Sequence, residues 1–328
     1  MDCILCDTDQ TTPYLVAPDM YTSERYRLVR CTCCGLIRTD RPPSSENLYV
    51  YGGTADAGAR FGLTQSLLRW FRRVRAHQFT EGRSGRALDV GCGDGSFLAA
   101  LAQEGWDVYG TELSASIAAS ATQRLGGRIR VGEIDNKTSH PDASFDLITL
   151  WHVLEHLENP RKALAEVRRL IKPDGTVVIA VPNIRSLQAL IFKQDWLHLD
   201  VPRHRWHFDP QTLRDLAERC GFEVKQIQHF SMEYGSFGIV QGIATSLGGG
   251  HVLFTRLVRL SPVELVREAS FWLHLVLLML ALLPSILVEA LAAVARRGGV
   301  VVMTLTPRGA RTLDNAVTDS ARGRFIRK

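Results

Sequence analysis

Short apolar runs alternate with amphipathic stretches through the middle of the chain. Residues 87–90 predict a buried strand, and a helical pattern begins near Ser96. A capping residue followed by proline opens one further helix at Asn159 and another at Asp209. More strands are predicted at residues 106–110, 128–135, 145–151, 176–181, 222–227 and 300–305, with a turn at 172–175. This alternation predicts an α/β fold with a doubly wound sheet.

The loop after the first strand carries three glycines at alternating positions. Gly91, Gly93 and Gly95 have no Cβ, so the backbone can turn tightly and approach a ligand closely. The helix that follows points its positive N-terminal end at the same place. Glu112 ends the second strand, where a carboxylate can accept hydrogen bonds from a ribose diol. These features indicate a nucleoside-binding site, although the spacing differs from the dinucleotide fingerprint G-x-G-x-x-G.

The stretch from Asp89 to Gly95 has the pattern D-x-G-x-G-x-G. It resembles the first motif of class I methyltransferases that use S-adenosylmethionine (SAM), within the ubiquinone-type small-molecule superfamily. The segment from Phe145-Asp146 to Leu154-Glu-His156 is similar to the fourth strand of that family. The resemblance implies a Rossmann-like, seven-stranded sheet with an antiparallel last strand. It also implies that SAM is bound by Asp89, Gly91, Cys92, Gly93, Gly95, Glu112, Leu113, Glu133, Ile134 and Trp151.

Four of the seven cysteines form two CxxC pairs near the N-terminus. Cys3 and Cys6 make the first pair, and Cys31 and Cys34 make the second. Two such turns can hold four thiolates around zinc, so we expect a structural zinc ribbon. A redox pair and a chance spacing are the alternatives, but neither turn has the strand-to-helix setting of a redox CxxC. Cys33 is an additional thiol that could substitute in the second turn.

Methyl transfer to a hydroxyl requires alignment of the acceptor and a base, for which histidine is suited. The loop at residues 195–208 is dense in polar groups and resembles a "PxHxxxF" segment of small-molecule methyltransferases. The candidates are His152 and His156 after the strand at 145–151, and His198, His204 and His207 before the helix that starts at Pro210. We expect His204 to be the base or a substrate ligand, with His207 as the second candidate and His156 as a substrate-orienting residue. The alternative is that these histidines only cap and pack the loop.

His152-Val-Leu-Glu-His156 also matches the zinc-peptidase pattern H-x-x-E-H. No peptidase scaffold surrounds it, so we reject that function. The ubiquinone-pathway O-methyltransferases that this region resembles place acid, acid and histidine here to hold a divalent ion. The first acid is His152 in this chain, and whether a divalent metal assists at His152, Glu155 and His156 stays open.

Residues 236–297 separate this chain from a simple methyltransferase. They contain a long apolar run from Phe271, interrupted by Pro284 and Glu289 and flanked by arginines. Both ends must return to the same sheet, so a single membrane crossing is excluded. We expect a helical hairpin broken at Pro284 that contacts a membrane surface, a lipid acceptor or a second subunit of a homodimer.

The expected organisation has six parts. They are a zinc ribbon at residues 1–40, a linker with a basic amphipathic helix at 41–82, the SAM-binding core at 83–234, the apolar hairpin at 235–298, the last core strand at 299–307 and a basic, disordered tail at 308–328.

Composition limits the function classes. A net charge of +5 over 328 residues does not by itself imply a nucleic-acid partner, and the N-terminus has no signal-peptide pattern. We therefore expect a cytoplasmic, peripherally membrane-associated methyltransferase acting on a hydroxyl or carbon of a small or lipid-linked acceptor, such as a prenylated phenol, glycolipid or sugar. The alternatives are an RNA base methyltransferase, which fits the greasy insertion poorly, and a non-enzymatic zinc-ribbon scaffold.

Overall fold

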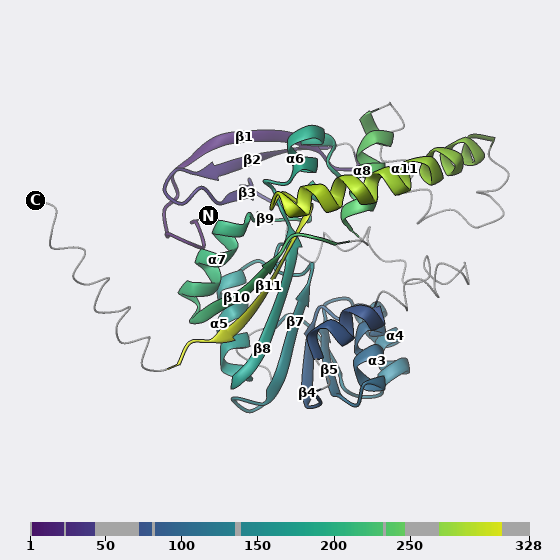
Figure 1. Cartoon of the computed structure of the whole chain (residues 1–328). Helices are drawn as coiled ribbons and strands as arrows, with labels where there is room; N and C mark the ends of the chain where they lie inside the picture. Colours follow the sequence, from purple (N-terminus) through teal and green to yellow (C-terminus); the bar gives the residue numbers. More distant parts are fainter. Residues whose placement is uncertain are drawn as a thin grey trace, which may run out of the picture.

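The computed structural model describes residues 2–22, 24–42, 72–80, 83–134, 139–231, 234–246 and 269–309, with the backbone alone at 269–279 and 282. A seven-stranded sheet forms its centre (Figure 1), with the strand order β10-β11-β8-β7-β4-β5-β6. These strands are β4 (Arg86–Val90), β5 (Asp107–Glu112), β6 (Ile129–Val131), β7 (Phe145–Trp151), β8 (Ile171–Pro182), β10 (Phe222–Gln228) and β11 (Val300–Pro307).

Only β11, the last strand along the chain, runs antiparallel to its two neighbours in this sheet. It pairs with β8 on one side and β10 on the other, whereas β8, β7, β4, β5 and β6 pair in parallel. The prediction of a doubly wound, Rossmann-like sheet with an antiparallel last strand is therefore confirmed.

Helices cover both faces of the sheet and bury its continuous apolar strands. On one face, side chains such as Leu164 and Leu213 pack against the strands, and on the other Leu98 and Ala76 do so. Burial on both faces accounts for the near absence of polar residues in β8 after Thr176. The helices are α3 (Ser96–Gln103), α4 (Ala115–Leu125), α5 (Pro160–Leu170), α6 (Leu187–Phe192), α7 (Pro210–Arg219), α8 (Gly235–Ala244) and α11 (Ala269–Val294), with further helical backbone at residues 72–80.

The predicted caps are confirmed, but the predicted turn at residues 172–175 is wrong. Asn159 accepts a hydrogen bond from the Lys162 amide at the start of α5, and Asp209 forms a capping box at the start of α7. Residues 172–175 lie inside β8 as an irregularity, because Phe145 pairs with Ile171 while Leu147 already pairs with Thr176. The turn-forming residues thus bulge from a continuous strand rather than ending it.

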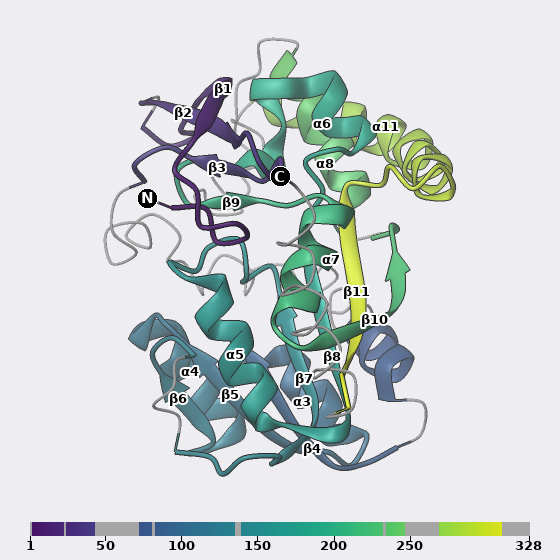
Figure 2. The same cartoon turned by 90° about the vertical axis from the view of Figure 1, so that its left-hand side faces the viewer.

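A second, four-stranded sheet lies at the end of the main sheet, beside α6, α8 and α11 (Figures 1 and 2). Its first three strands come from the N-terminal segment: β1 (Thr11–Pro18), β2 (Arg25–Cys31) and β3 (Ile37–Thr39). The fourth, β9 (Trp206–His207), belongs to the polar loop after β8 and pairs antiparallel with β3. Two short 3-10 helices, η3 (Lys193–Asp195) and η4 (Leu197–Leu199), precede β9 in that loop.

The apolar insertion forms helices, but it is not broken at Pro284. α11 continues through this proline, and the Ser285 hydroxyl donates to the Ala281 carbonyl beside it. A proline inside a helix costs one backbone hydrogen bond without necessarily ending the helix. α11 packs against α8, the other described helix of the insertion. Within the described residues, no helix combines the length and apolar composition needed to cross a bilayer.

Candidate functional site

The glycine loop between β4 and α3 lies against the acidic end of β5. Gly91, Gly93 and Gly95 have φ angles of 68°, 55° and 73°, a left-handed conformation that favours glycine. Glu112 Oε2 accepts a hydrogen bond from the Gly93 amide at 3.0 Å, and its Oε1 accepts from Ser114 at 2.9 Å. The carboxylate is thereby fixed at the loop, with further lone pairs available for ligand hydroxyls.

Asp89 is buried beneath this loop. Its Oδ1 accepts a hydrogen bond from the Thr149 hydroxyl at 2.6 Å, across the β4–β7 pair. Burial raises the pKa of Asp89 to about 7, although the Thr149 hydrogen bond and the charge of Arg75 oppose that rise. The group therefore titrates close to neutral pH.

The other expected cofactor residues are distributed around the same strand ends. Leu113 and Glu133 are partly exposed, whereas Cys92 and Ile134 are buried. The Cys92 sulfur packs against Gly110 of β5 and leaves no room there for a side chain, because a Cβ at Gly110 would lie 2.7 Å from the sulfur. Trp151 packs against Phe79 and Phe97, with ring centroids 5.5 Å and 5.6 Å away.

A cavity of about 210 Å³ opens beside Trp151 and His152. The adjacent Val153 covers the glycine loop, since a Cβ at Gly91 would lie 2.5 Å from its Cγ2 atom. This cavity, which we call the acceptor cavity, is lined by Val74, Arg75, Gln78, Phe79, Trp151, His152, Ala180, Gln228, Phe230, Ser231, Tyr234, Val300 and Val302. It therefore adjoins the expected cofactor site.

His152 is the histidine that lines the acceptor cavity. Its φ of 55° is in the left-handed region, which is unusual for a residue other than glycine. The imidazole Nδ1 lies 3.3 Å from Glu155 Oε1, and the ring lies 4.1 Å from the Tyr234 ring. Burial opposes ionisation of Glu155, but the contact with His152 and the other nearby histidines lower the pKa of this carboxyl below its ordinary value.

The histidines that the sequence favoured are packed behind His152 and Glu155. His204 and His207 are both buried, and burial lowers the pKa of His204 well below its usual value and that of His207 to about 3. His204 Nδ1 lies 2.9 Å from the His198 carbonyl oxygen, and His207 Nε2 lies 3.1 Å from the Thr39 hydroxyl. Both rings are therefore neutral near pH 7, and each has a polar partner at hydrogen-bond distance.

Glu155, His156 and His204 lie close enough to share a ligand. Each offers one ligand atom, and these atoms all lie within 4.8 Å of one another. His156 Nδ1 lies 3.0 Å from the Arg203 carbonyl oxygen, so both histidines have one ring nitrogen engaged by backbone. Both oxygens of Glu155 are buried without a hydrogen bond to the described residues. These three residues could hold a metal ion.

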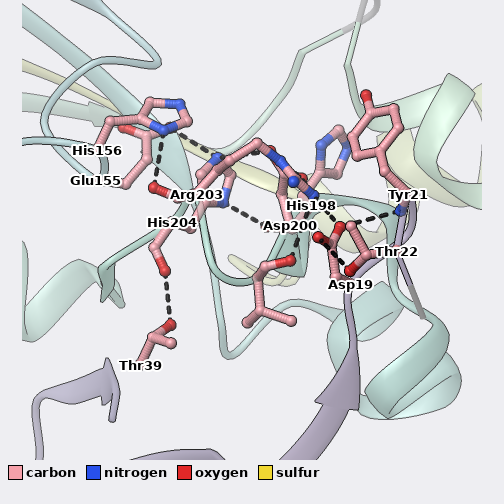
Figure 3. Close-up of polar contacts among 11 residues, drawn as sticks. Asp19, Tyr21, Thr22, Thr39, Glu155, His156, His198, Asp200, Arg203 and His204 are labelled. Carbon is pink, nitrogen blue, oxygen red and sulfur yellow. Dashed lines mark hydrogen bonds and ion pairs between the residues drawn. The ribbon is translucent and has the colours of Figure 1, made fainter. Parts of the chain in front are cut away.

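A buried ion-pair network fastens the polar loop to the N-terminal sheet (Figure 3). Arg203 Nη2 lies 2.9 Å from Asp19 Oδ1 and 2.6 Å from Asp200 Oδ1, and its guanidinium lies 4.5 Å from the Tyr21 ring centroid. The Thr39 hydroxyl donates to the His204 carbonyl at 2.7 Å. The N-terminal segment thus holds the backbone of the histidine loop.

The four paired cysteines converge at the base of that sheet. The sulfur atoms of Cys3 and Cys34, and those of Cys6 and Cys31, are 3.4 Å apart, and all four lie within 4.8 Å of one another. Burial opposes ionisation of Cys31, but backbone hydrogen bonds from Cys34 and Cys33 lower its pKa to about 7. Tetrahedral zinc with Zn–S bonds of about 2.3 Å separates its sulfurs by about 3.8 Å, so the cluster has the size of such a site.

His152 and Tyr234 lie side by side in this cavity, although the sequence favours His204 and carries no signal at Tyr234. His152 is one of the five histidines considered for the base, but the sequence favours His204 and His207. The available signal was its place directly after a buried strand, at the edge of a parallel sheet where ligands bind. Tyr234 follows β10 without any motif, so only the structure brings it to this cavity.

Comparison with known proteins gives a match over the central part of the chain. The family model described as "Methyltransferase domain" matches residues 63–227. A ubiquinone biosynthesis O-methyltransferase of Methylococcus capsulatus is 36% identical over 124 residues, which cover 36% of this chain and 51% of that relative. One with the same description from Bordetella avium is 27% identical over 200 residues, covering 58% of this chain and 80% of the relative. The chain thus spans about half of the length of the first of these relatives.

Solved structures are similar over comparable parts. A SAM-dependent methyltransferase from Archaeoglobus fulgidus has a TM-score of 0.43 and 27% identity, covering 50% of this chain and 73% of that one. A putative sarcosine dimethylglycine methyltransferase from Galdieria sulphuraria has a TM-score of 0.49 and 15% identity, covering 80% and 98%.

Proposed function

The chain belongs to the methyltransferase domain family, and from this premise we propose that it transfers the methyl group of SAM to a hydroxyl of a small acceptor. The observation that carries the proposal is the fixed Glu112 carboxylate, 3.0 Å from the Gly93 amide in a loop of left-handed glycines. Its remaining lone pairs suit the two hydroxyls of a ribose. The methionine part of SAM would lie along the glycine loop, where no Cβ obstructs it.

His152 takes the role of base in this proposal. Glu155 faces Nδ1 of the imidazole, so a proton held on that nitrogen leaves Nε2 free to accept one from the acceptor hydroxyl. The neighbouring carboxylate also stabilises the imidazolium that forms. SAM supplies the activated methyl group, and the cavity walls align the acceptor. His204, His207 and His156 then position the loop behind the base rather than take the proton themselves.

The acceptor we propose is a prenylated, phenol-like or otherwise lipid-linked molecule. Support comes from the described function of the relatives, ubiquinone biosynthesis O-methylation, and from the aromatic lining of the acceptor cavity. Exposed leucines on α11, among them Leu283, Leu287 and Leu291, suit peripheral contact with a membrane at the cytoplasmic surface. The RNA alternative receives no support from the relatives, and methylation at carbon remains a variant of the same chemistry.

We also propose that the cysteine cluster binds structural zinc. The four facing sulfurs, all within 4.8 Å of one another, suit a tetrahedral thiolate site. Zinc there would supply no chemistry to the reaction. It would join the segment before β1 to the turn between β2 and β3.

The test is calorimetric binding of SAM to the full chain and to Glu112→Ala. Two hydrogen bonds to a charged group are worth enough for the variant to bind at least about tenfold more weakly. The matched control is Glu104→Ala, an exposed acid at the end of α3, which should bind like the parent. Equal affinity of Glu112→Ala and the parent would refute the ribose assignment, and no binding to the parent would refute the function.

A further inference from the structure

A second and larger cavity lies beyond the ends of β8 and β11. Its volume is about 960 Å³, within the range of small-molecule sites. Its walls come from distant parts of the chain: the N-terminal sheet, the segment around α6, the start of α7 and the residues after α11. Nothing in the proposed transfer of a methyl group uses this cavity.

Its walls are strongly cationic. Among the described residues, six basic side chains line it against one carboxylate, that of Asp209; the six are Arg30, Arg185, Lys193, Arg214, Arg296 and Arg297. Asp209 is already engaged, because its Oδ1 accepts from the Thr212 amide at 2.8 Å and its Oδ2 lies 3.8 Å from Arg185. This carboxylate therefore cannot neutralise the cavity.

Three of these cations have no ion pair with any described residue. Arg296, Arg297 and Lys193 are exposed and have no acidic partner within the described residues. Gathering like charges around one hollow is unfavourable unless an anion occupies it, and it raises the local concentration of anions. Guanidinium groups in particular match the oxygens of phosphate with paired hydrogen bonds.

The cationic cavity is close to the acceptor cavity. Ala180 of β8 and Val300 of β11 line the acceptor cavity. Asn183, three residues after Ala180, and Arg297, three residues before Val300 on the antiparallel neighbour, line the cationic one. Three residues of extended chain span about 10 Å. Gln228 and His229 likewise line the two cavities in turn. The two cavities therefore open near one another, at the ends of β8, β10 and β11.

We propose that the cationic cavity binds a phosphate or diphosphate group of the methyl acceptor. The acceptor is then a phosphate-bearing molecule whose hydroxyl lies at His152 while its anionic end is held by the arginines. This inference rests on the proposed methyl transfer for its purpose, but not for its test. The phosphate can belong to a soluble acceptor or to a lipid, for which Leu190 at the rim and the exposed leucines of α11 offer an apolar surface.

The first experiment is calorimetric titration of the full chain with inorganic pyrophosphate. We expect a Kd below about 1 mM for the parent. The double variant Arg296→Gln/Arg297→Gln should bind at least about tenfold more weakly, since it loses two charge-assisted contacts. The control is Lys162→Gln/Arg219→Gln, which removes the same charge from exposed positions on α5 and α7, outside the cavity. It should stay within about twofold of the parent, because long-range charge alone is screened by salt.

A second arm separates the two sources of phosphate. Flotation with phosphatidylcholine vesicles is compared with and without phosphatidic acid, for the parent and for both double variants. Pyrophosphate binding without vesicle binding identifies a soluble acceptor, whereas vesicle binding that needs phosphatidic acid and is lost in Arg296→Gln/Arg297→Gln identifies a lipid. If the cavity variant behaves like the control in both arms, the proposal is wrong. SAM affinity, measured on the same samples, reports separately on the proposed methyl transfer.

Discussion

Two buried carboxyl groups at the glycine loop have different partners. Glu112 accepts from two backbone amides, whereas the described partner of Asp89 is a neutral hydroxyl, that of Thr149. Backbone amides at a loop stabilise a negative charge and fix its position. A hydroxyl compensates burial less well, which agrees with the rise in the pKa of Asp89 to about 7. The loop therefore holds one charged anchor for a ligand and one acid that is costly to ionise.

This cost predicts how stability depends on pH. The pKa of Asp89 is about 7 in the folded chain and about 3.9 in an unfolded one, so the folded state retains a proton that the unfolded state has lost. The free energy of unfolding should fall as the pH rises from about 4 to about 7. Asp89→Asn keeps an acceptor for Thr149 but cannot ionise, so urea titrations at pH 5 and pH 8 should differ less for this variant. An identical pH dependence in both proteins would contradict the assignment.

A substitution at His152 tests the base. His152→Asn tolerates the left-handed backbone but cannot take a proton from the acceptor. We expect turnover to fall by about 10²–10⁴-fold with SAM affinity unchanged. His77→Asn, at an exposed histidine on the helix at residues 72–80, serves as the control. If His204→Ala lowers turnover as strongly while His152→Asn does not, the base belongs to the loop.

Residues in local motifs could be predicted from the sequence, and residues placed by tertiary packing could not. The glycines and Glu112 follow directly from one strand–loop–helix–strand segment, and the spacing alone brings them together. The burial of His204 and His207 depends on Thr39, which is 165 residues earlier in the chain than His204. No periodicity or motif in either segment indicates that contact.

The same distinction holds for whole elements. Asn159 and Asp209 cap the helices they were expected to cap, because capping needs only the next few residues. β9 is two residues long and forms through its pairing with β3, so no local sequence pattern predicts it. Residues 172–175 are typical of a turn, and Pro284 is typical of a helix end. Strand β8 nevertheless continues through the first, and helix α11 through the second.

The Glu289 side chain anchors the apolar helix α11 to the rest of the fold. The side chain is fully buried, and its two oxygens accept from the Gln188 amide group at 2.7 Å and the Gly299 amide at 2.8 Å. Burial raises the pKa of this carboxyl, while those two hydrogen bonds oppose the rise. The acid that interrupts the apolar run thus joins α11 to α6 and to the start of β11.

Removing this carboxyl should be costly. Glu289→Ala leaves two buried donors unpaired, at about 1–3 kcal/mol of unfolding free energy each. Leu287→Ala, two residues earlier and 61% exposed, should change it by less than about 0.5 kcal/mol. Chemical denaturation of both variants makes the comparison. Equal stability of the two would mean that α11 is held by its apolar contacts alone.

At the scale of the molecule, the N-terminal sheet is part of the site rather than an appendage. β3 pairs with β9, Asp19 holds Arg203, and Arg205 and Trp206 donate backbone hydrogen bonds to the Glu155 carbonyl. A continuous set of contacts therefore runs from the cysteine cluster to the carboxylate beside His152. Changes at the cluster should reach the site through this route.

Loss of a cysteine tests that route. Cys34→Ser removes one of the four converging sulfurs, whereas Cys33→Ser removes an exposed neighbour outside the pairs and is the matched control. We expect zinc content to fall in the first variant alone, and the amides of Arg205 and Trp206 to exchange with deuterium at least about tenfold faster, because their opening free energy falls with the sheet that supports them. The amides of β4 and β7, packed in the main core, provide an internal reference and should keep their rates. Unchanged exchange at Arg205 in a zinc-free Cys34→Ser protein would show that the loop stands without the cluster.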